Sequence, residues 1–176
     1  MNERITVKKL FWAWNYEKEE KWLREMSNKG YEFDSWSIGK YRFTKKEPRD
    51  VIYKLDYNPW WGRNSGGYME FIKECGWEWC DSMCGWNLYR CDADKCLSEE
   101  IYTGKDKIKI IHRIGTFAMV LSVLEGVCFF MGFIKPMIEG RWPGIVYTIL
   151  WSFLILEFLI IDINLYSAYR KKKKEL

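Results

Sequence analysis

Two long apolar runs, residues 114–134 and 144–161, dominate the C-terminal third of the chain, and the second run extends to residue 166. As a helix, the 21 residues of the first run rise about 31 Å, which matches the hydrocarbon thickness of a bilayer. The link between the runs, residues 135–143, contains two prolines and a glycine and is typical of a turn. The pattern predicts a transmembrane hairpin with helices at 114–134 and 144–166. The alternative is a pair of buried core helices, for which a chain of 176 residues offers little covering protein.

Basic residues flank the hairpin on the side of the two chain ends. The juxtamembrane segment 105–113 and the tail 167–176 are rich in lysine and arginine, whereas the link carries only Lys135 and Arg141. By the positive-inside rule, we expect both termini to be cytoplasmic in a two-helix protein of the cell membrane. The N-terminus has no continuous apolar segment of the kind found in a cleavable signal. The tail also suits an anionic lipid surface, although a plain stop-transfer signal explains it without lipid specificity.

In the N-terminal part, residues 1–104, the patterns of apolar and polar residues extend over shorter segments than in the hairpin. Alternating apolar and polar positions predict six strands, and apolar residues at spacings of three and four predict two helices. The predicted strands are 5–14, 31–36, 41–43, 51–57, 77–83 and 86–91, and the predicted helices are 16–29 and 68–75. The order is therefore strand–helix–strand–strand, given twice.

Glycines mark the same two places in each half of this internal repeat. Each predicted helix ends at Gly30 or Gly76, and nine residues later Gly39 or Gly85 lies in the next predicted turn. Both places call for positive φ, which glycine adopts without steric cost. The repeat predicts an α+β domain over 1–104, an antiparallel sheet with two helices on one face and the other face free.

The composition adds 11 Trp, 11 Tyr and 10 Phe to this picture. A free sheet face cannot remain bare hydrocarbon on a soluble domain, and Trp and Tyr combine apolar area with a polar group. We therefore expect an aromatic face that binds a small amphipathic ligand or a protein partner. Its candidate residues are Trp12, Trp14, Trp36, Tyr41, Tyr53, Trp60, Trp61, Trp77, Trp79 and Trp86. The alternative is an ordinary aromatic core, except for Trp60 and Trp61, which lie in a Pro/Gly-rich loop and have less structural reason to be there.

Charge and cysteine spacing narrow the classes of partner. Residues 1–113 hold 21 basic and 19 acidic side chains with no clustered basic face, so no nucleic-acid partner is expected. Five of the six cysteines lie between Cys75 and Cys96, but no C-x-x-C occurs and the single histidine is His112. No metal or other cofactor is therefore expected. A cytoplasmic location predicts reduced thiols that serve in packing, with metal binding and redox sensing as weaker alternatives.

No catalytic constellation is recognisable in the sequence. It has no phosphate-binding glycine loop and no G-x-S-x-G, so we expect a protein that is not an enzyme. Three acids at the start of the first predicted helix, Glu17, Glu19 and Glu20, suit its dipole and are interpreted as solvated. Glu125 and Glu157 lie inside the apolar runs, where acids are functional candidates. They either couple to a partner's basic residue or to a proton, or are tolerated structural acids.

Three segments carry a resemblance to a known family. Residues 10–23 read LFWAWNYEKEEKWL, residues 26–30 read MSNKG, and residues 53–57 read YKLDY. Together they resemble the bacterial DUF2812 family, over residues 11–90. The resemblance implies a cytosolic module often fused to membrane helices in Gram-positive bacteria and often encoded beside PadR-type repressors. It implies a regulatory or stress-response setting and supplies no catalytic residues.

Three functions are compatible with these features. The first is a membrane-anchored sensor or regulator whose aromatic face binds its ligand or partner, with the bilayer, a membrane protein or a transcriptional regulator as partners. The second is an accessory subunit of a membrane transporter or another membrane complex, bound through Glu125 or Glu157. The third, a membrane hydrolase, is disfavoured by the missing site residues.

Overall fold

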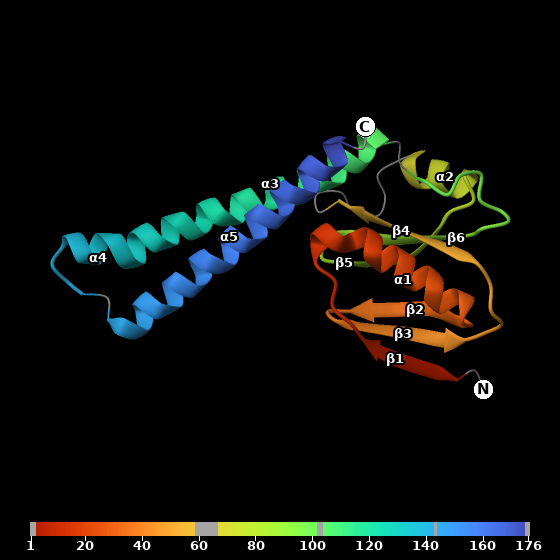
Figure 1. The fold of residues 1–176 in the computed structure, drawn as a ribbon, viewed down its shortest axis with the longest axis horizontal. Coiled ribbons are helices and arrows are strands. Elements are labelled where there is room, and N and C mark those ends of the chain that lie inside the picture. Colours follow the sequence, from red (N-terminus) through yellow and green to blue (C-terminus); the bar gives the residue numbers. More distant parts are fainter. Residues whose placement is uncertain (1–2, 59–66, 102–103, 143, 175–176) are drawn as a thin grey trace. The chain divides into compact units, whose positions relative to one another are not determined.

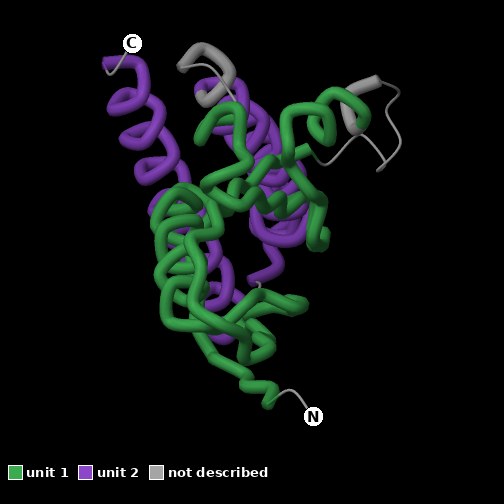
Figure 2. The backbone as a smooth tube through the Cα atoms, turned by 90° about the vertical axis from the view of Figure 1, so that its right-hand side faces the viewer, with its two compact units in different colours: residues 1–103 green, residues 104–176 purple. Residues whose placement is uncertain are grey.

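The computed structural model describes residues 3–58, 67–101, 104–142 and 144–174 (Figure 1). The chain forms two compact units, residues 1–103 and 104–176, which are coloured separately in Figure 2. The first unit contains the strands and two helices, and the second contains the long C-terminal helices. The fold is therefore mixed α+β followed by a helical hairpin, which confirms the predicted class.

The first unit follows the predicted order strand–helix–strand–strand twice. Its elements are β1 (Arg4–Lys8), the 3-10 turn η1 (Ala13–Asn15), α1 (Tyr16–Asn28), β2 (Tyr31–Ser37), β3 (Lys40–Lys45), β4 (Val51–Tyr57), α2 (Gly67–Glu74), β5 (Glu78–Met83) and β6 (Trp86–Asp92). The predicted first strand, 5–14, is wrong in its second half. Lys8 pairs with Lys40, the first residue of β3, so the partner strand has no further residue with which to continue the ladder.

Antiparallel pairing gives two three-stranded sheets, ordered β1–β3–β2 and β4–β6–β5, where one continuous sheet was expected. The edge strands β2 and β5 are linked by a side chain, since the backbone N–H of Trp36 donates to Asp81 Oδ2 at 3.2 Å. Both edge strands are irregular at the same place in the repeat, between Phe33 and Ser35 and between Trp79 and Asp81. The sheets are thus separate ladders, and the edge strands β2 and β5 meet without a backbone ladder between them.

The repeated glycines have the conformations that their positions require. Gly30 and Gly76 end the helices with φ of +83° and +89°, and Gly39 and Gly85 form the hairpin turns with φ of +66° and +83°. A Cβ atom at Gly30 would lie 2.6 Å from the backbone oxygen of Lys46. A side chain is excluded there by close approach as well as by φ.

Each repeat builds its own apolar core. In the first, Leu23 of α1 is fully buried, and Trp22 meets Tyr41 and Phe43 of β3 with ring centroids 4.9 and 5.6 Å apart. In the second, Ile72 of α2 packs on the second sheet in a cluster that consists of Ile52, Ile72, Trp77, Tyr89 and Cys91. Helix α1 also contacts β4 of the second repeat, so it joins the two halves of the unit.

The second unit is a helical hairpin. Helix α3 (Gly104–Phe129) continues through a π-helical turn, η2 (Phe130–Ile134), into α4 (Lys135–Ile138), and α5 (Ile145–Lys174) returns beside α3 (Figure 1). The helices thus include the basic flanks, and the turn is shorter than the predicted link. Gly140 and Gly144 provide its positive φ angles.

Both arms of the hairpin, 108–138 and 145–174, are long and apolar enough to cross a membrane. Most of their described large apolar side chains are exposed, which a protein surface in water does not tolerate over such an area. Four serine and threonine hydroxyl groups within these arms donate to the carbonyl oxygen four residues earlier, as Ser122 does to Ala118 and Ser152 to Thr148. These polar groups therefore need no partner from the surroundings.

Candidate functional site: an aromatic pocket

The hairpin turns of both repeats open onto one mainly apolar pocket of about 250 Å³, here called the aromatic pocket. Its walls come from segment 9–13, from Tyr16 and Glu19 of α1, from Leu55 of β4 and from the β2–β3 and β5–β6 turns. Duplication explains the location, since the equivalent turns of both halves lie at this end. Lys9 N–H donates to the carbonyl of Gly39 at 3.1 Å, which holds the wall segment against the first turn.

Aromatic rings form much of the wall. Trp36 lies edge-on to Tyr41 with centroids 6.4 Å apart, and Trp86 packs on Tyr16 with centroids 5.8 Å apart. Trp12 is 53% exposed. At the rim, Leu10 and Ile38 are also exposed, by 65% and 76%. The pocket therefore joins ring-lined walls to an apolar rim that water reaches.

Glu19 is the acidic group of this pocket. Its side chain is buried, at 8% exposure, and the hydroxyl of Tyr41 donates to Glu19 Oε1 at 2.7 Å. Burial raises the pKa of the Glu19 carboxyl, and the bond from Tyr41 only partly opposes that rise. Burial and the neighbouring carboxylate likewise raise the pKa of the Tyr41 phenol. Among the described residues, no basic side chain forms an ion pair with Glu19.

Lys9 and Cys84 complete the chemistry of the wall. Lys9 is exposed, and its ammonium lies 5.0 Å from the centroid of Phe11 and 4.5 Å from that of Trp22. Its charge is thus held over ring faces. Cys84 is an exposed free thiol with φ of +50° beside Gly85 in the β5–β6 turn. Cys84 gives the pocket a chemical handle for labelling.

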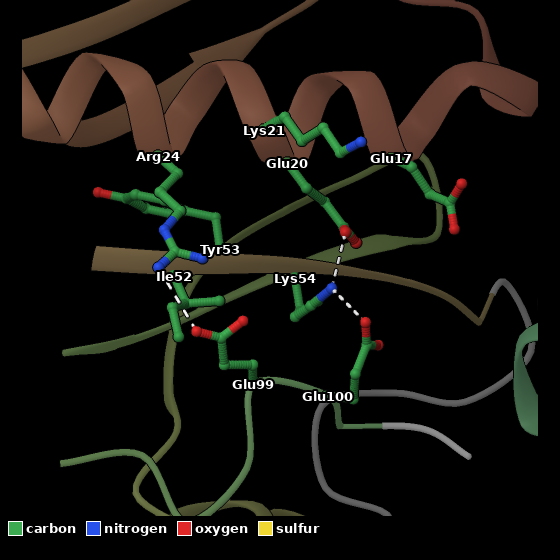
Figure 3. A pocket seen from close by; sticks show the side chains of 9 residues that line it. All are labelled: Glu17, Glu20, Lys21, Arg24, Ile52, Tyr53, Lys54, Glu99 and Glu100. Atoms are coloured by element: carbon green, nitrogen blue, oxygen red, sulfur yellow. Dashed lines mark hydrogen bonds and ion pairs between the residues drawn. The ribbon is translucent and has the colours of Figure 1, made fainter. Parts of the chain in front are cut away.

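A second pocket, of about 320 Å³, is lined by charged side chains of α1, β4 and residues 99–100 (Figure 3). Lys54 lies between Glu20 and Glu100, with Nζ to carboxylate distances of 3.1 and 3.3 Å (Figure 3). Arg24 reaches Glu99 at 3.5 Å. These charges satisfy one another, so this charged pocket has a structural explanation that the aromatic pocket lacks.

Glu20 joins the charged pocket to the edge of the second sheet. Its Oε1 accepts the backbone N–H of Leu55 at 2.9 Å, which occupies a donor on the open edge of β4. Burial raises the pKa of the Glu20 carboxyl to about 7, and the charge of Lys54 does not fully offset this. The interpretation of Glu19 and Glu20 as solvated acids is therefore wrong. Both lie on the face of α1 that is turned toward the protein, and Tyr16 and Leu23 are buried on the same face.

The family model described as "Protein of unknown function (DUF2812)" matches residues 15–123, more than half of the chain. The chain belongs to the DUF2812 family. No curated protein and no solved structure matches it. The DUF2812 match includes most of both repeats and part of α3, and thus extends beyond the resemblance over 11–90. The family description assigns no residue a role, so the site rests on geometry.

Four of the ten predicted aromatic residues line the aromatic pocket of this DUF2812 protein: Trp12, Trp36, Tyr41 and Trp86. Trp14 stacks on Trp12 with centroids 5.2 Å apart. The sequence had also suggested an ordinary core, and other members of the set lie there.

Tyr53 and Trp77 are almost fully buried, and Trp79 packs against the core of the second repeat. The Tyr53 hydroxyl accepts the backbone N–H of Phe33 at 3.4 Å, which ties β4 to β2. Trp60 and Trp61 lie outside the described residues. The aromatic residues thus divide between core and pocket.

The cysteines differ from expectation at one pair. Cys91 and Cys96 form a disulfide with Cα atoms 5.8 Å apart, where reduced thiols were predicted. The backbone N–H groups of Lys95 and Cys96 both donate to the carbonyl of Asp92, and this turn brings Cys96 back to Cys91. Within the described ranges, no group of three or more His, Cys, Asp or Glu residues is placed to hold a metal ion.

The two acids within the apolar arms lie on neighbouring helices, Glu125 on α3 and Glu157 on α5. Their charges are close enough to interact. Glu157 is exposed, whereas Glu125 is partly buried and its Oε1 has no hydrogen-bond partner among the described residues.

Proposed function

We propose that this DUF2812 protein is a membrane-anchored sensor or regulatory module, not an enzyme, that binds a small amphipathic ligand through the aromatic pocket. The regulatory setting follows from the family resemblance. A non-catalytic role is supported by the sequence, which has no phosphate-binding glycine loop and no G-x-S-x-G and whose single histidine, His112, belongs to the helical unit.

The observation that carries the proposal is the aromatic pocket itself. Its volume of about 250 Å³ is slightly below the usual range for small-molecule sites, so it suits a compact ligand or one part of a larger one. Rings and apolar side chains supply most of the walls, and a few polar groups lie among them. This combination favours a molecule with an apolar body and a polar group.

Anchoring in the bilayer and a cytoplasmic head are the second part of the proposal. The basic ends of both helices support it by the positive-inside rule. The disulfide argues the other way, because cytoplasmic thiols are generally reduced. We give the flanking charges more weight, since many residues contribute to them, whereas the sulfur pair follows from one local turn.

A ligand screen on the full chain in neutral-detergent micelles tests the proposal. Planar amphipathic compounds are expected to change tryptophan fluorescence and to slow alkylation of Cys84, as mapped by mass spectrometry. Replacing two wall residues, Trp36→Ala with Trp86→Ala, should abolish both effects. Trp142→Ala, which changes an exposed tryptophan of the helical unit, should preserve them. A broad panel that never protects Cys84 would contradict the proposal.

A second candidate function is that of an accessory subunit of a membrane complex. It is favoured by Glu125, whose Oε1 has no partner in the described part of the chain, and by the exposed Glu157 nearby. A basic residue on a partner helix would satisfy these acids.

Crosslinking in native membranes tests this alternative. A partner should be recovered with the wild type and lost when Glu125→Gln and Glu157→Gln are combined. Glu139→Gln is the control, because Glu139 lies next to the turn and already pairs with Arg141. Equal recovery from all three chains would contradict the role of the acids.

A further inference from the structure

The aromatic pocket contains an acid whose charge is not balanced by the protein. Glu19 is 8% exposed, and its hydrogen-bond partner is a neutral hydroxyl, that of Tyr41, which donates to Glu19 Oε1 at 2.7 Å. Removing a carboxylate from water is costly unless a cation or several hydrogen bonds compensate it. No described lysine or arginine compensates it.

The acids of the charged pocket are a useful contrast on the same helix. Glu20, one residue further on, has Lys54 at 3.1 Å and the backbone N–H of Leu55 at 2.9 Å. The fold therefore supplies Glu20 with a cation and a backbone donor. Glu19 lines the aromatic pocket instead, so a positively charged ligand in this pocket could compensate its charge.

Ring faces add a second attraction for positive charge. Trp, Tyr and Phe attract cations through the negative potential above their rings. This end of the unit already holds one such cation, because Lys9 lies over Phe11 and Trp22. Trp36 and Trp86 offer further rings in the same pocket.

We infer that the aromatic pocket selects an organic cation, with its positive nitrogen beside Glu19 and its apolar body against Trp36 and Trp86. This inference rests on the proposed function and narrows its ligand class. A neutral amphiphile would leave Glu19 uncompensated, and an anion would be repelled by it. Burial raises the pKa of the Glu19 carboxyl in the empty pocket, and a bound cation would favour its ionised form.

A matched pair of fluorescent probes tests the inference on the full chain in neutral-detergent micelles. The cation is 4-(4-dimethylaminostyryl)-N-methylpyridinium, and its partner is the parent pyridine without the N-methyl group, uncharged at about pH 8. Empty micelles provide the blank, and alkylation of Cys84 reports whether a probe occupies the pocket. The wild type should bind the cation about tenfold more tightly than the neutral probe.

Glu19→Gln should remove this preference while neutral-probe affinity stays the same, because the amide keeps an oxygen for the Tyr41 hydroxyl. Glu17→Gln, which removes the same charge from the same helix outside the pocket, should retain the preference. If Glu19→Gln does not fold, the comparison of the two probes on the wild type decides the inference by itself, and Tyr41→Phe, which leaves the carboxylate in place, is a control that should retain the preference.

The outcomes separate the two proposals. Equal binding of both probes to the wild type, with Cys84 protected, overturns the cation inference and supports the pocket as a ligand site. A preference that persists in Glu19→Gln also overturns it. Failure of both probes to bind or to protect Cys84 counts against the proposed function as well.

Discussion

Glu20 offers a quantitative test of how the fold positions its buried acids. The side chain is 8% exposed, and burial raises the pKa of its carboxyl from 4.5 to about 7. Because the folded-state pKa lies above the unfolded-state value, Glu20 takes up a proton on folding between these two pH values. Its contribution to stability is complete below about pH 4.5 and is lost as the pH rises through about 7.

The magnitude follows from the same two pKa values. A rise from 4.5 to about 7 corresponds to about 3 kcal/mol, an upper value because the surroundings relax. Glu20→Gln removes the titration and keeps an oxygen for the Leu55 N–H. The variant's free energy of unfolding, relative to the wild type, should therefore increase by about 2.5 kcal/mol between about pH 5 and pH 8.

Urea unfolding of the full chain in neutral detergent, followed by tryptophan fluorescence at a series of pH values, measures this difference. The comparison with wild type cancels other titrating groups, including Glu19. Glu25→Gln removes an exposed acid from the same helix and should leave the pH dependence close to that of the wild type. A Glu20→Gln difference that stays constant with pH would refute the reasoning, because the carboxyl would then titrate alike in both states.

Three further predictions concern the junction of the repeats, the glycine positions and the topology. Glu32→Gln should lower the free energy of unfolding by about 2 kcal/mol in urea titrations, because Glu32 accepts bonds from Lys46, Arg49 and Arg90. An unchanged midpoint would show that these ion pairs contribute nothing. Gly30→Ala should cost about 2–4 kcal/mol, since the residue has positive φ and its Cβ would meet a backbone oxygen at 2.6 Å. Circular dichroism melts measure this, and a melting temperature equal to wild type would contradict it. Cys84 should react with a membrane-impermeant maleimide only after cells are permeabilised. Labelling in intact cells would show that the first unit lies outside the cell, opposite to the proposed topology.

Much of the architecture was predictable because it depends on residues that lie close together in the sequence. The two helices of the first unit, the hairpin turns and the duplication follow from the glycines at 30, 39, 76 and 85, whose φ angles are positive. The apolar arms were recognisable from length alone. The division into two sheets was not predictable, because it depends on how the edge strands β2 and β5 meet, and the alternation of residues within each strand carries no information on that contact.

The site was only partly predictable, for a related reason. Aromatic composition pointed to a binding face, but strand alternation does not tell a core ring such as Trp77 from a wall ring such as Trp36. Glu19 was missed because acids in a first helical turn usually face water. Its spacing from Tyr16 and Leu23, three and four residues, was the available signal for a buried position.

The side-chain link between β2 and β5 has a mechanical consequence. The two sheets are separate ladders, with no backbone ladder between them. Two side-chain interactions cross this boundary, that of Asp81 with the Trp36 backbone and that of Arg90 with Glu32. Both turns that frame the pocket lie across this boundary, one from each ladder. A ligand that contacts both turns would bridge the same boundary. The free energy of unfolding of the first unit would then rise with ligand concentration.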